Sequence, residues 1–293
     1  MQGIVGVLAA DHVAAALVVE NRVSGLIRLY PEPGAEGEAM ASLHAEDIID
    51  LIAREVAQLT KGQPVDTIGV GFPGIIRDGV VEESPNLQQT KGCRLQERLA
   101  AALNARVLVL NDADATAAGI AATQDRLETL VRVWTLGVGI GYGRYPRSQG
   151  VWEGGHMVVS LDPKERYCGC GGIGHLEGVM GQAAMRRRFL DLEPDEVFTA
   201  AQAGDPRCAA FVKLWHRSLA AATANSIHLD GPGKFFISGL SARFVDVPLL
   251  SQYLQEMVKM SSLQGSLFEV ITTSDETAIV GAAINAGRAR TAA

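Results

Sequence analysis

The sequence has no block of positive charge, and its cations are outnumbered. Its 293 residues contain 26 Lys and Arg against 33 Asp and Glu, which gives a formal net charge of −7. A nucleic-acid surface needs clustered cations to neutralise phosphates, so we expect no nucleic acid among the partners. The densest basic run, residues 185–189, lies in a helical pattern and is predicted to be a solvated helix face.

Cysteines are few, and no apolar run reaches the length of a membrane span. The N-terminus also lacks the charged segment that opens a signal peptide, so we expect a cytoplasmic protein without a membrane partner. Two of the four cysteines are one residue apart, which is not the pattern of a secreted disulfide framework and indicates a metal instead. Cys93 and Cys208 stand alone and are predicted to be ordinary buried or half-buried thiols.

Apolar residues, in contrast, make up 47% of the chain, which is ample for buried cores. The length exceeds that of a usual single core, so two lobes are expected. Periodicity predicts strands over 4–10, 14–20, 22–31, 66–74, 105–112, 132–146 (a strand, a glycine turn and a strand), 234–239 and 266–274. It predicts helices over 44–59, 95–103, 113–123, 181–190, 194–203, 205–228, 247–260 and 277–290. This alternation predicts an α/β fold of two similar lobes with a ligand cleft between them.

The segment from Trp152 to Gly178 concentrates side chains that bind metals. It reads WEGGHMVVSLDPKERYCGCGGIGHLEG and offers two imidazoles and two thiols for a tetrahedral zinc site: His156, Cys168, Cys170 and His175. Such a site would be structural, because all four ligands come from the protein. The alternative is a glycine-rich loop with reduced thiols. Glu153 and Glu177 flank the set, and a fixed loop would hold both carboxylates toward a polar ligand.

Polar residues also end the strand predicted over 105–112. Asn111 and Asp112 lie at its carboxyl end, where open α/β sheets bind ligands. A cap for the following helix explains the same residues, so Asp112 is interpreted as cap, as base, or as both.

Four glycines alternate at Gly137, Gly139, Gly141 and Gly143. They fit a twisted hairpin of small residues or a backbone that approaches a phosphate. No GK[ST] sequence follows, which excludes a P-loop, and no GxGxxG opens a helix.

Six segments, in order, carry a family likeness. They are GVGFPGIIRDGVV with SPNL (69–81 and 84–87), NDADATAAG (111–119), TLGVGIGYG (135–143), EGGH (153–156), CGCGGIGHLE (168–177) and ISGLS (237–241). Together they resemble the ROK family of repressors, open reading frames and kinases, in the actin-like ATPase superfamily. The likeness extends from about Val65 to the end of the chain, with a weaker trace at the N-terminus.

The resemblance implies two actin-like (ribonuclease H-like) lobes. The first would comprise residues 1–113, closed by a final helix at about 278–293, and the second residues 114–277 with a zinc loop at 152–178. It also implies ATP-dependent phosphorylation of a hexose or N-acetylhexosamine, with Mg bound to ATP, structural zinc, and a homodimer or homotetramer. The family's repressors carry an N-terminal helix-turn-helix, whereas this chain begins with strands, so DNA binding is not expected.

The resemblance also assigns residues to roles. Asp112 would be the general base on the attacking hydroxyl. The sugar would be bound by Gly74, Asn86, Asn111, Glu153, His156 and Glu177. The nucleotide would lie against Gly137, Val138, Gly139, Gly141 and Gly239.

The chain departs from the family pattern in two places. At the metal, His175 occupies the third thiol position, so the set has fewer thiolate charges and is expected to bind zinc more weakly. At the N-terminus, VLAADHVAA (7–15) replaces a DxGGT-type phosphate loop: Leu8 stands at the aspartate, and Asp11 and His12 occupy the turn. Val138 also replaces a threonine in the second phosphate loop.

These departures leave two functions open. Asp112 is retained, which favours a working sugar kinase with an unusual phosphate loop, or one that uses another phosphoryl donor. The lost DxGGT loop favours a sugar-binding pseudokinase that senses or regulates. A homologue without any ligand is disfavoured by the intact polar set.

Overall fold

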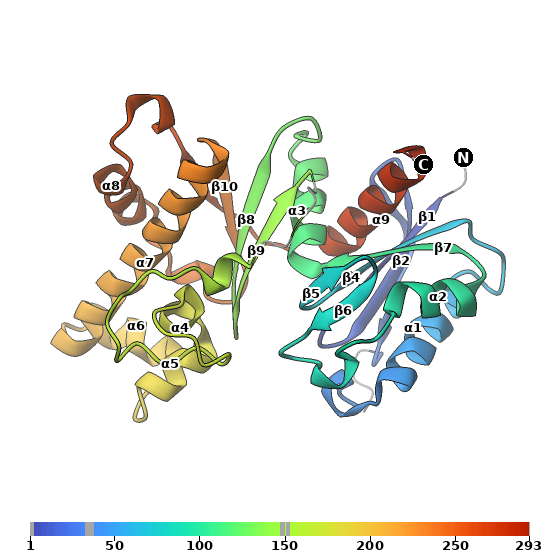
Figure 1. The fold of residues 1–293 in the computed structure, drawn as a ribbon, viewed down its shortest axis with the longest axis horizontal. Coiled ribbons are helices and arrows are strands. Elements are labelled where there is room, and N and C mark those ends of the chain that lie inside the picture. The colour runs from blue at the N-terminus through green and yellow to red at the C-terminus, as the bar shows by residue number, and fades with distance from the viewer. Residues whose placement is uncertain (1–2, 33–37, 147–149, 151–152, 293) are drawn as a thin grey trace. The chain divides into compact units, whose positions relative to one another are not determined.

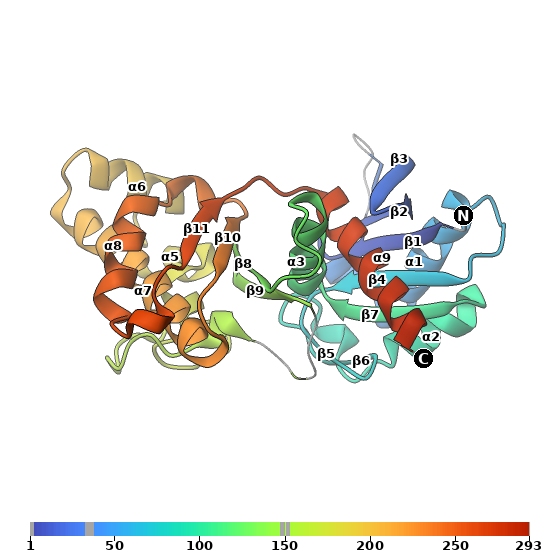
Figure 2. The same ribbon diagram turned by 90° about the horizontal axis from the view of Figure 1, so that it is seen from above.

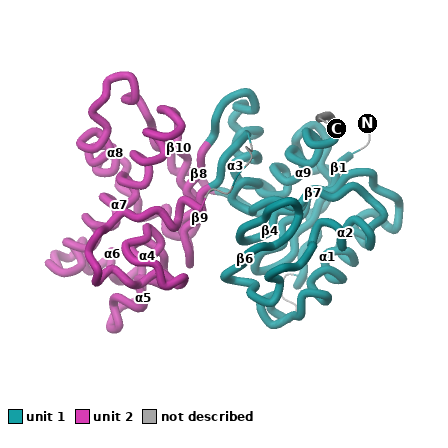
Figure 3. The backbone as a smooth tube through the Cα atoms, viewed as in Figure 1, with its two compact units in different colours: residues 1–131, 143–152, 273–293 teal, residues 132–142, 153–272 magenta. Residues whose placement is uncertain are grey.

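The computed structural model describes residues 3–32, 38–146, 150 and 153–292, and the chain divides into two compact units. Unit 1 comprises residues 1–131, 143–152 and 273–293, and unit 2 comprises residues 132–142 and 153–272 (Figure 3). The lobes implied by the resemblance stay a prediction; the contacts within the chain place residues 114–131 in unit 1. Trp152, the first residue of the predicted metal-binding segment, lies outside the described residues.

Unit 1 is built on a five-stranded sheet in the order β3-β2-β1-β4-β7 (Figure 1). The first three strands, β1 (Ile4–Ala9), β2 (Val13–Val19) and β3 (Arg22–Tyr30), pair antiparallel. β1 also pairs parallel with β4 (Thr67–Phe72), which pairs parallel with β7 (Arg106–Asn111). The carboxyl ends of β1, β4 and β7 therefore meet at one edge, the edge at which open α/β sheets bind ligands.

Helices cover both faces of this sheet (Figures 1 and 2). Successive side chains of a strand point to opposite faces, and β1 shows the consequence. Val5 and Val7 join the core cluster with Ile48 of α1 (Ala45–Leu59). On the other face, a Cβ added to Gly6 would lie 2.1 Å from a backbone oxygen of α9 (Asp275–Ala292). The last helix therefore packs directly on the strand that starts the chain.

Among the described residues, α2 (Leu95–Leu103) and α3 (Asp112–Thr123) are the other two α-helices of unit 1. α2 buries Leu95 and Leu99 in the same core cluster as α1. α3 follows β7 directly and packs backbone to backbone against α9. A Cβ on Gly119 would lie 1.8 Å from the carbonyl oxygen of Thr277, which shows how close the two backbones are.

Unit 2 carries a four-stranded sheet in the order β11-β10-β8-β9. Its strands are β8 (Val131–Leu136), β9 (Ile140–Tyr145), β10 (Lys234–Ser238) and β11 (Leu267–Val270), and β10 pairs parallel with both β8 and β11. The longest helix, α7 (Pro206–Asp230), packs on this sheet, because fully buried Trp134 of β8 donates its indole N–H to Thr223 at 3.1 Å. The remaining helices are α4 (Leu176–Met180), α5 (Gln182–Arg188), α6 (Pro194–Gln202) and α8 (Val247–Met257).

The strands and helices predicted from periodicity are present, with ends shifted by a few residues. The short α4 and one hairpin were not predicted. In that hairpin, β5 (Ile75–Arg77) and β6 (Val80–Glu83) are joined by Asp78 and Gly79, which have φ of 50° and 76°. An Asp-Gly pair is a strong hairpin signal, because both positions need positive φ. The hairpin could therefore have been predicted from the sequence.

Two smaller expectations have clear outcomes. Cys93 is half-buried and Cys208 is buried, as predicted. The basic run is only partly a solvated face: Arg186 and Arg187 are exposed, but Arg188 turns inward, and its side chain is only 17% exposed. None of the described helices combines the length and apolarity that a membrane crossing requires.

Candidate functional site

The end of β7 brings three predicted site residues together. Asn111 is the N-cap of α3, where its side-chain oxygen accepts hydrogen bonds from the backbone N–H groups of Ala113 at 2.8 Å and Asp114 at 3.3 Å. Its side-chain amide donates to the carbonyl oxygen of Gly74 at 2.9 Å. The cap is therefore Asn111, and Asp112 is the first residue of the helix. The sequence left the capping role of Asp112 open, and the structure assigns that role to its neighbour.

Asp112 is half-buried, and burial raises the pKa of its carboxyl group above the ordinary value. The N–H groups of Ala113 and of Asp112 itself lower that pKa, whereas the negative charge of Asp11 raises it further. A carboxylate with a raised pKa holds a transferred proton more readily, which suits a general base.

The other predicted residues of unit 1 differ in their surroundings. Gly74 has φ of 108°, and a Cβ there would lie 2.1 Å from the carbonyl oxygen of Glu83, so the turn after β4 requires glycine. Asn86 lies in a bend and is exposed.

The turn between β1 and β2 shows what replaced the expected phosphate loop. Leu8 is half-buried and packs against an apolar cluster formed by Leu110, Ala115, Ala278 and Ala282. Asp11 is exposed at the tip. His12 Nε2 lies 2.8 Å from Asp275 Oδ2, at the start of α9. The apolar contact of Leu8 and the pair of His12 and Asp275 thus hold the two sides of the turn in place within unit 1.

In unit 2, a pairing of two backbone segments brings the four predicted metal ligands together. Val158 and His175 form an antiparallel bridge, supported by hydrogen bonds from Leu176 to Met157 at 2.9 Å and from Val159 to Gly174 at 2.8 Å. This pairing places His156 and His175 side by side. Cys168 and Cys170 complete the group, and the candidate ligand atoms of all four residues lie within 4.8 Å of one another.

The spacing of these atoms fits a tetrahedral zinc ion. Bonds of about 2.3 Å to sulfur and 2.0–2.1 Å to nitrogen imply separations of about 3.3 Å for two nitrogens, 3.6 Å for sulfur and nitrogen, and 3.8 Å for two sulfurs. The Nδ1 atoms of His156 and His175 are 3.2 Å apart, and the sulfurs of Cys168 and Cys170 are 3.3 Å apart. Cys170 Sγ lies 3.5 Å and 3.2 Å from the Nδ1 atoms of His156 and His175. The donor set and its spacing therefore suit zinc.

The pKa shifts of His175 and Cys168 determine how metal binding would depend on pH. Burial, and secondarily the charge of His156, lowers the pKa of His175, which keeps this imidazole neutral as a ligand must be. Burial raises the pKa of the Cys168 thiol to about 12. A cation that binds there must therefore displace the thiol proton, so binding strengthens as pH rises.

The two acids beside the cluster have different partners. Glu153 Oε2 lies 3.9 Å from His156 Nε2, the ring nitrogen that is not turned to the cluster. Glu177 lies in α4 and accepts a hydrogen bond from the backbone N–H of Ile140 at 3.1 Å. Its other oxygen lies 3.5 Å from Cys168 Sγ. The contact with Ile140 could not be anticipated, because the two residues are 37 positions apart and an isoleucine amide carries no sequence signal.

Two glycine turns lie next to each other at the carboxyl ends of the parallel strands β8 and β10. The residues from Gly137 to Gly141 follow β8, and Gly239 follows β10. Gly239 has φ of 94°, and a Cβ there would lie 2.6 Å from the carbonyl oxygen of Leu136. Val138, at the tip of the first turn, is 57% exposed. The predicted nucleotide-side residues thus gather at one edge of the unit 2 sheet.

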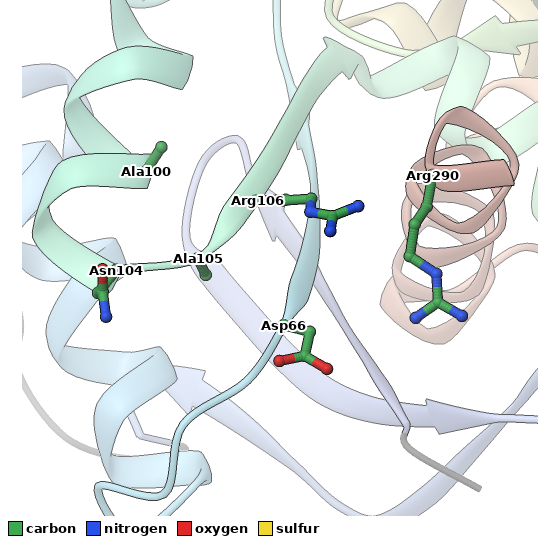
Figure 4. Close-up of a pocket in the computed structure, with 6 residues that line it drawn as sticks. All are labelled: Asp66, Ala100, Asn104, Ala105, Arg106 and Arg290. Atoms are coloured by element: carbon green, nitrogen blue, oxygen red, sulfur yellow. The ribbon is translucent and has the colours of Figure 1, made fainter. Parts of the chain in front are cut away.

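A separate hollow of about 550 Å³ lies at the opposite edge of the unit 1 sheet, where β4 and β7 begin (Figure 4). Its described lining comprises Asp66, Ala100, Asn104, Ala105, Arg106 and Arg290. None of these residues belongs to the predicted site.

Comparisons with known proteins agree with the likeness read from the sequence. A model of the ROK family matches residues 35–288. The glucokinase of Pyrobaculum calidifontis is 27% identical over 245 residues, which cover 78% of this chain and 81% of the relative. The glucokinase of Thermotoga maritima is 28% identical over 276 residues, covering 81% and 84% of the two chains.

Solved structures show the same fold. The ROK hexokinase from Thermus thermophilus superimposes with a TM-score of 0.79 at 23% identity and covers all of both chains. A ROK family glucokinase from Streptomyces griseus, crystallised with glucose and AMPPNP, gives a TM-score of 0.71 at 22% identity and covers 98% of this chain and 99% of the other. The chain belongs to the ROK family, and its fold is the actin-like α/β fold of that family's kinases.

Proposed function

We propose that the protein is an ATP-dependent kinase that transfers a phosphoryl group to a hydroxyl of a hexose or an N-acetylhexosamine. Family membership and the two glucokinase relatives support this class of reaction. The observation that carries the proposal is Asp112: a carboxylate with a raised pKa at the carboxyl end of a parallel strand, at the start of a helix.

The chemistry asks little of the protein beyond positioning and one proton acceptor. The sugar hydroxyl oxygen attacks the γ-phosphorus of ATP, and a new O–P bond forms while the bond to the bridging oxygen of ADP breaks. The hydroxyl proton passes to Asp112. The raised pKa favours that transfer, because the Asp112 carboxylate is a stronger base than that of an ordinary aspartate.

We assign the sugar to polar groups that accept or donate hydroxyl hydrogen bonds. Glu153 and Glu177 offer carboxylate acceptors, and His156 offers Nε2, since its Nδ1 faces the cysteines. Asn111 retains a second amide hydrogen beside its bond to Gly74. Gly74 and Asn86 complete the proposed sugar-binding set.

The nucleotide is assigned to the two glycine turns of unit 2. Gly137, Val138, Gly139 and Gly141 present a backbone with few side-chain atoms, which lets amide groups approach a phosphate. Gly239 lies beside them against Leu136. Mg, as in kinases generally, would enter with ATP and neutralise the phosphate charge.

Zinc is proposed as a structural ion held by His156, Cys168, Cys170 and His175, with no ligand position left for water. It would fix the loop that carries His156 and leads into Glu177. As the resemblance implies, we propose a cytoplasmic homodimer or homotetramer, which light scattering of the purified protein would test.

A second function, a sugar-binding pseudokinase, is favoured by one observation. Leu8 stands where the family carries an aspartate, and it packs in an apolar cluster rather than offering a carboxylate to a metal. The turn beyond it is held by the pair of His12 and Asp275. A protein of this kind would bind a sugar and transfer no phosphate.

Calorimetry separates the two functions. Wild-type protein is titrated with ATP–Mg and, separately, with a panel of hexoses and N-acetylhexosamines. The kinase requires binding of both, together with turnover in an ADP-coupled assay that Asp112→Asn abolishes. Sugar binding without nucleotide binding would overturn the ATP-dependent kinase and favour the pseudokinase. Turnover unchanged in Asp112→Asn would remove this residue from the mechanism.

A further inference from the structure

Glu177 connects two parts of unit 2 that the proposed function treats separately. Its Oε2 accepts the backbone N–H of Ile140 at 3.1 Å, and its Oε1 lies 3.5 Å from Cys168 Sγ. Ile140 is the first residue of β9 and directly follows the turn of Gly137, Val138 and Gly139. One carboxylate therefore touches both the metal-binding loop and the end of the glycine turn.

The fit between carboxylate and turn is close. A Cβ on Gly139 would lie only 2.7 Å from Glu177 Oε2, so the turn passes directly over this oxygen. The start of α5 also holds the turn, because Gln182 N–H donates to Gly137 O at 3.0 Å and Ala183 N–H donates to Val138 O at 3.2 Å. Among these described contacts with the turn, the one from Glu177 also reaches a predicted metal ligand.

Physical reasons make this contact consequential. Ile140 is buried, and a buried N–H without a partner costs free energy comparable to a lost hydrogen bond. A bond to a carboxylate is stronger than one between neutral groups. Glycines lose more conformational entropy on ordering than other residues, so the turn depends on such contacts to hold one conformation.

We propose that Glu177 is a positioning residue that couples the metal-binding loop to the glycine turn. A metal in the four-residue set fixes His175, which is the N-cap of α4, and with it the start of the helix that carries Glu177. The carboxylate is thereby kept against Ile140, and the turn is held in the conformation of the structure. Loss of the metal loosens the turn through the same residue. The consequence for nucleotide binding rests on the proposed function; the coupling itself does not.

The sugar role proposed for Glu177 is compatible with this coupling. A carboxylate has about four lone-pair positions on its two oxygens, so Oε1 can accept a hydroxyl while Oε2 stays on Ile140. If Glu177 only bound sugar, however, replacing it would not change the turn in a protein measured without sugar.

Hydrogen–deuterium exchange, measured without sugar or nucleotide, tests the coupling. The readout is exchange across residues 137–141, with the centre of α7 as an internal reference. Wild-type protein is measured with zinc, after chelation, and after zinc is returned. We expect exchange in the turn to become roughly tenfold faster or more on chelation, as befits loss of a hydrogen bond to a charged group. It should recover with zinc, while α7 stays unchanged.

Three variants locate the effect. In Glu177→Ala the turn should exchange fast both with and without zinc. Glu177→Gln keeps an oxygen acceptor for the Ile140 N–H but loses the charge, so with zinc its turn should exchange at a rate between those of the wild type and Glu177→Ala. Glu256→Ala is the control, because it removes an exposed acid of α8 that lies outside the predicted metal set and the proposed sugar and nucleotide sets; it should behave like wild type.

The outcomes are decisive in both directions. The proposal is overturned if the turn of Glu177→Ala exchanges as slowly as that of the wild type and responds to zinc in the same way. It is also overturned if chelation leaves exchange in the wild-type turn unchanged. If Glu177→Ala fails to fold, the wild-type zinc series and Glu177→Gln still decide. A protein that transfers no phosphate would show this in the turnover assay and would leave the exchange results unchanged.

Discussion

Arg188 binds Glu165 through two guanidinium nitrogens, one on each carboxylate oxygen, and so joins α5 to the loop that carries the predicted metal ligands. The pair is shielded, because the two side chains are 17% and 12% exposed, and the guanidinium also lies 4.2 Å from the ring centroid of Tyr167. The backbone of Glu165 accepts a hydrogen bond from Gly174 at 2.7 Å, one residue before a predicted metal ligand. The loop is thus held from α5 as well as by its own pairing.

Replacing Arg188 should therefore destabilise the protein. We expect Arg188→Ala to lower the free energy of unfolding by about 2–4 kcal/mol, because it leaves a carboxylate with little solvent and no partner. Arg186 provides the matched control: its pair with Glu193 is 49% and 63% exposed, so Arg186→Ala should cost at most about 1 kcal/mol. Urea unfolding measures both, and equal losses would refute the difference in shielding.

Leu8 offers a test of the altered N-terminal turn. Leu8→Asp restores the residue type that the family carries, but it places a carboxylate against the apolar cluster around Leu110. We expect a loss of stability on the order of 2 kcal/mol without gain in ATP affinity, whereas Leu8→Met should cost less than about 1.5 kcal/mol. If Leu8→Asp bound ATP more tightly and were as stable as the wild type, position 8 would face the ligand and the prediction would be wrong.

The pH dependence of turnover should report Asp112. Its pKa is raised, and only the deprotonated form accepts a proton, so kcat/KM should fall on acidification at a higher pH than an ordinary carboxyl group would give. The charge of Asp11 contributes to that elevation. Asp11→Asn should therefore move the acidic limb to lower pH, and an unchanged limb would remove Asp112 as its origin.

Metal content checks the four-residue set. Purified wild-type protein should contain about one zinc per chain, and chelation should lower its melting temperature, because a ligand that binds only the folded state stabilises it. Cys170→Ser should lose most of the zinc. Cys208→Ser is the control, since this buried thiol lies outside the set. Full zinc occupancy in Cys170→Ser would contradict the assignment.

His216 makes stability depend on pH in unit 2. Its Nδ1–H donates to Val212 O at 2.8 Å, and its Nε2 accepts the N–H of Asp246 at 2.9 Å, an arrangement that requires the neutral ring. Burial lowers its pKa below the unfolded value of about 6.5. The unfolded state then binds more protons, so this stabilisation is complete above about pH 6.5 and is lost as pH falls toward the folded pKa.

The expected slope is at most about 1.4 kcal/mol per pH unit below pH 6.5. Urea unfolding at several pH values measures it. His216→Gln should be less stable near neutrality but should lose less on acidification, whereas exposed His228→Gln should keep the wild-type slope.

Local signals in the sequence were sufficient to predict most of the helices and strands of this protein and the family to which it belongs. The apolar spacing of Ile48, Leu51, Ile52 and Val56 predicts α1, because burial on one helix face repeats every three to four residues. The family and the four residues of the candidate metal set were recognised from ordered segments, in which ligand types and spacing are visible directly. Polar residues at the end of β7 marked Asp112, since strand ends are where such sheets bind ligands.

Only the tertiary structure decided which atoms those residues use. It gave the cap to Asn111 rather than Asp112, packed Leu8 into an apolar cluster, turned Arg188 inward, and set Glu177 against the amide of Ile140. The last three of these depend on contacts between segments far apart in the chain, and a backbone amide has the same chemistry at almost every residue. Periodicity and spacing report what a segment buries, whereas the partner of a polar atom is settled by where the other segments lie.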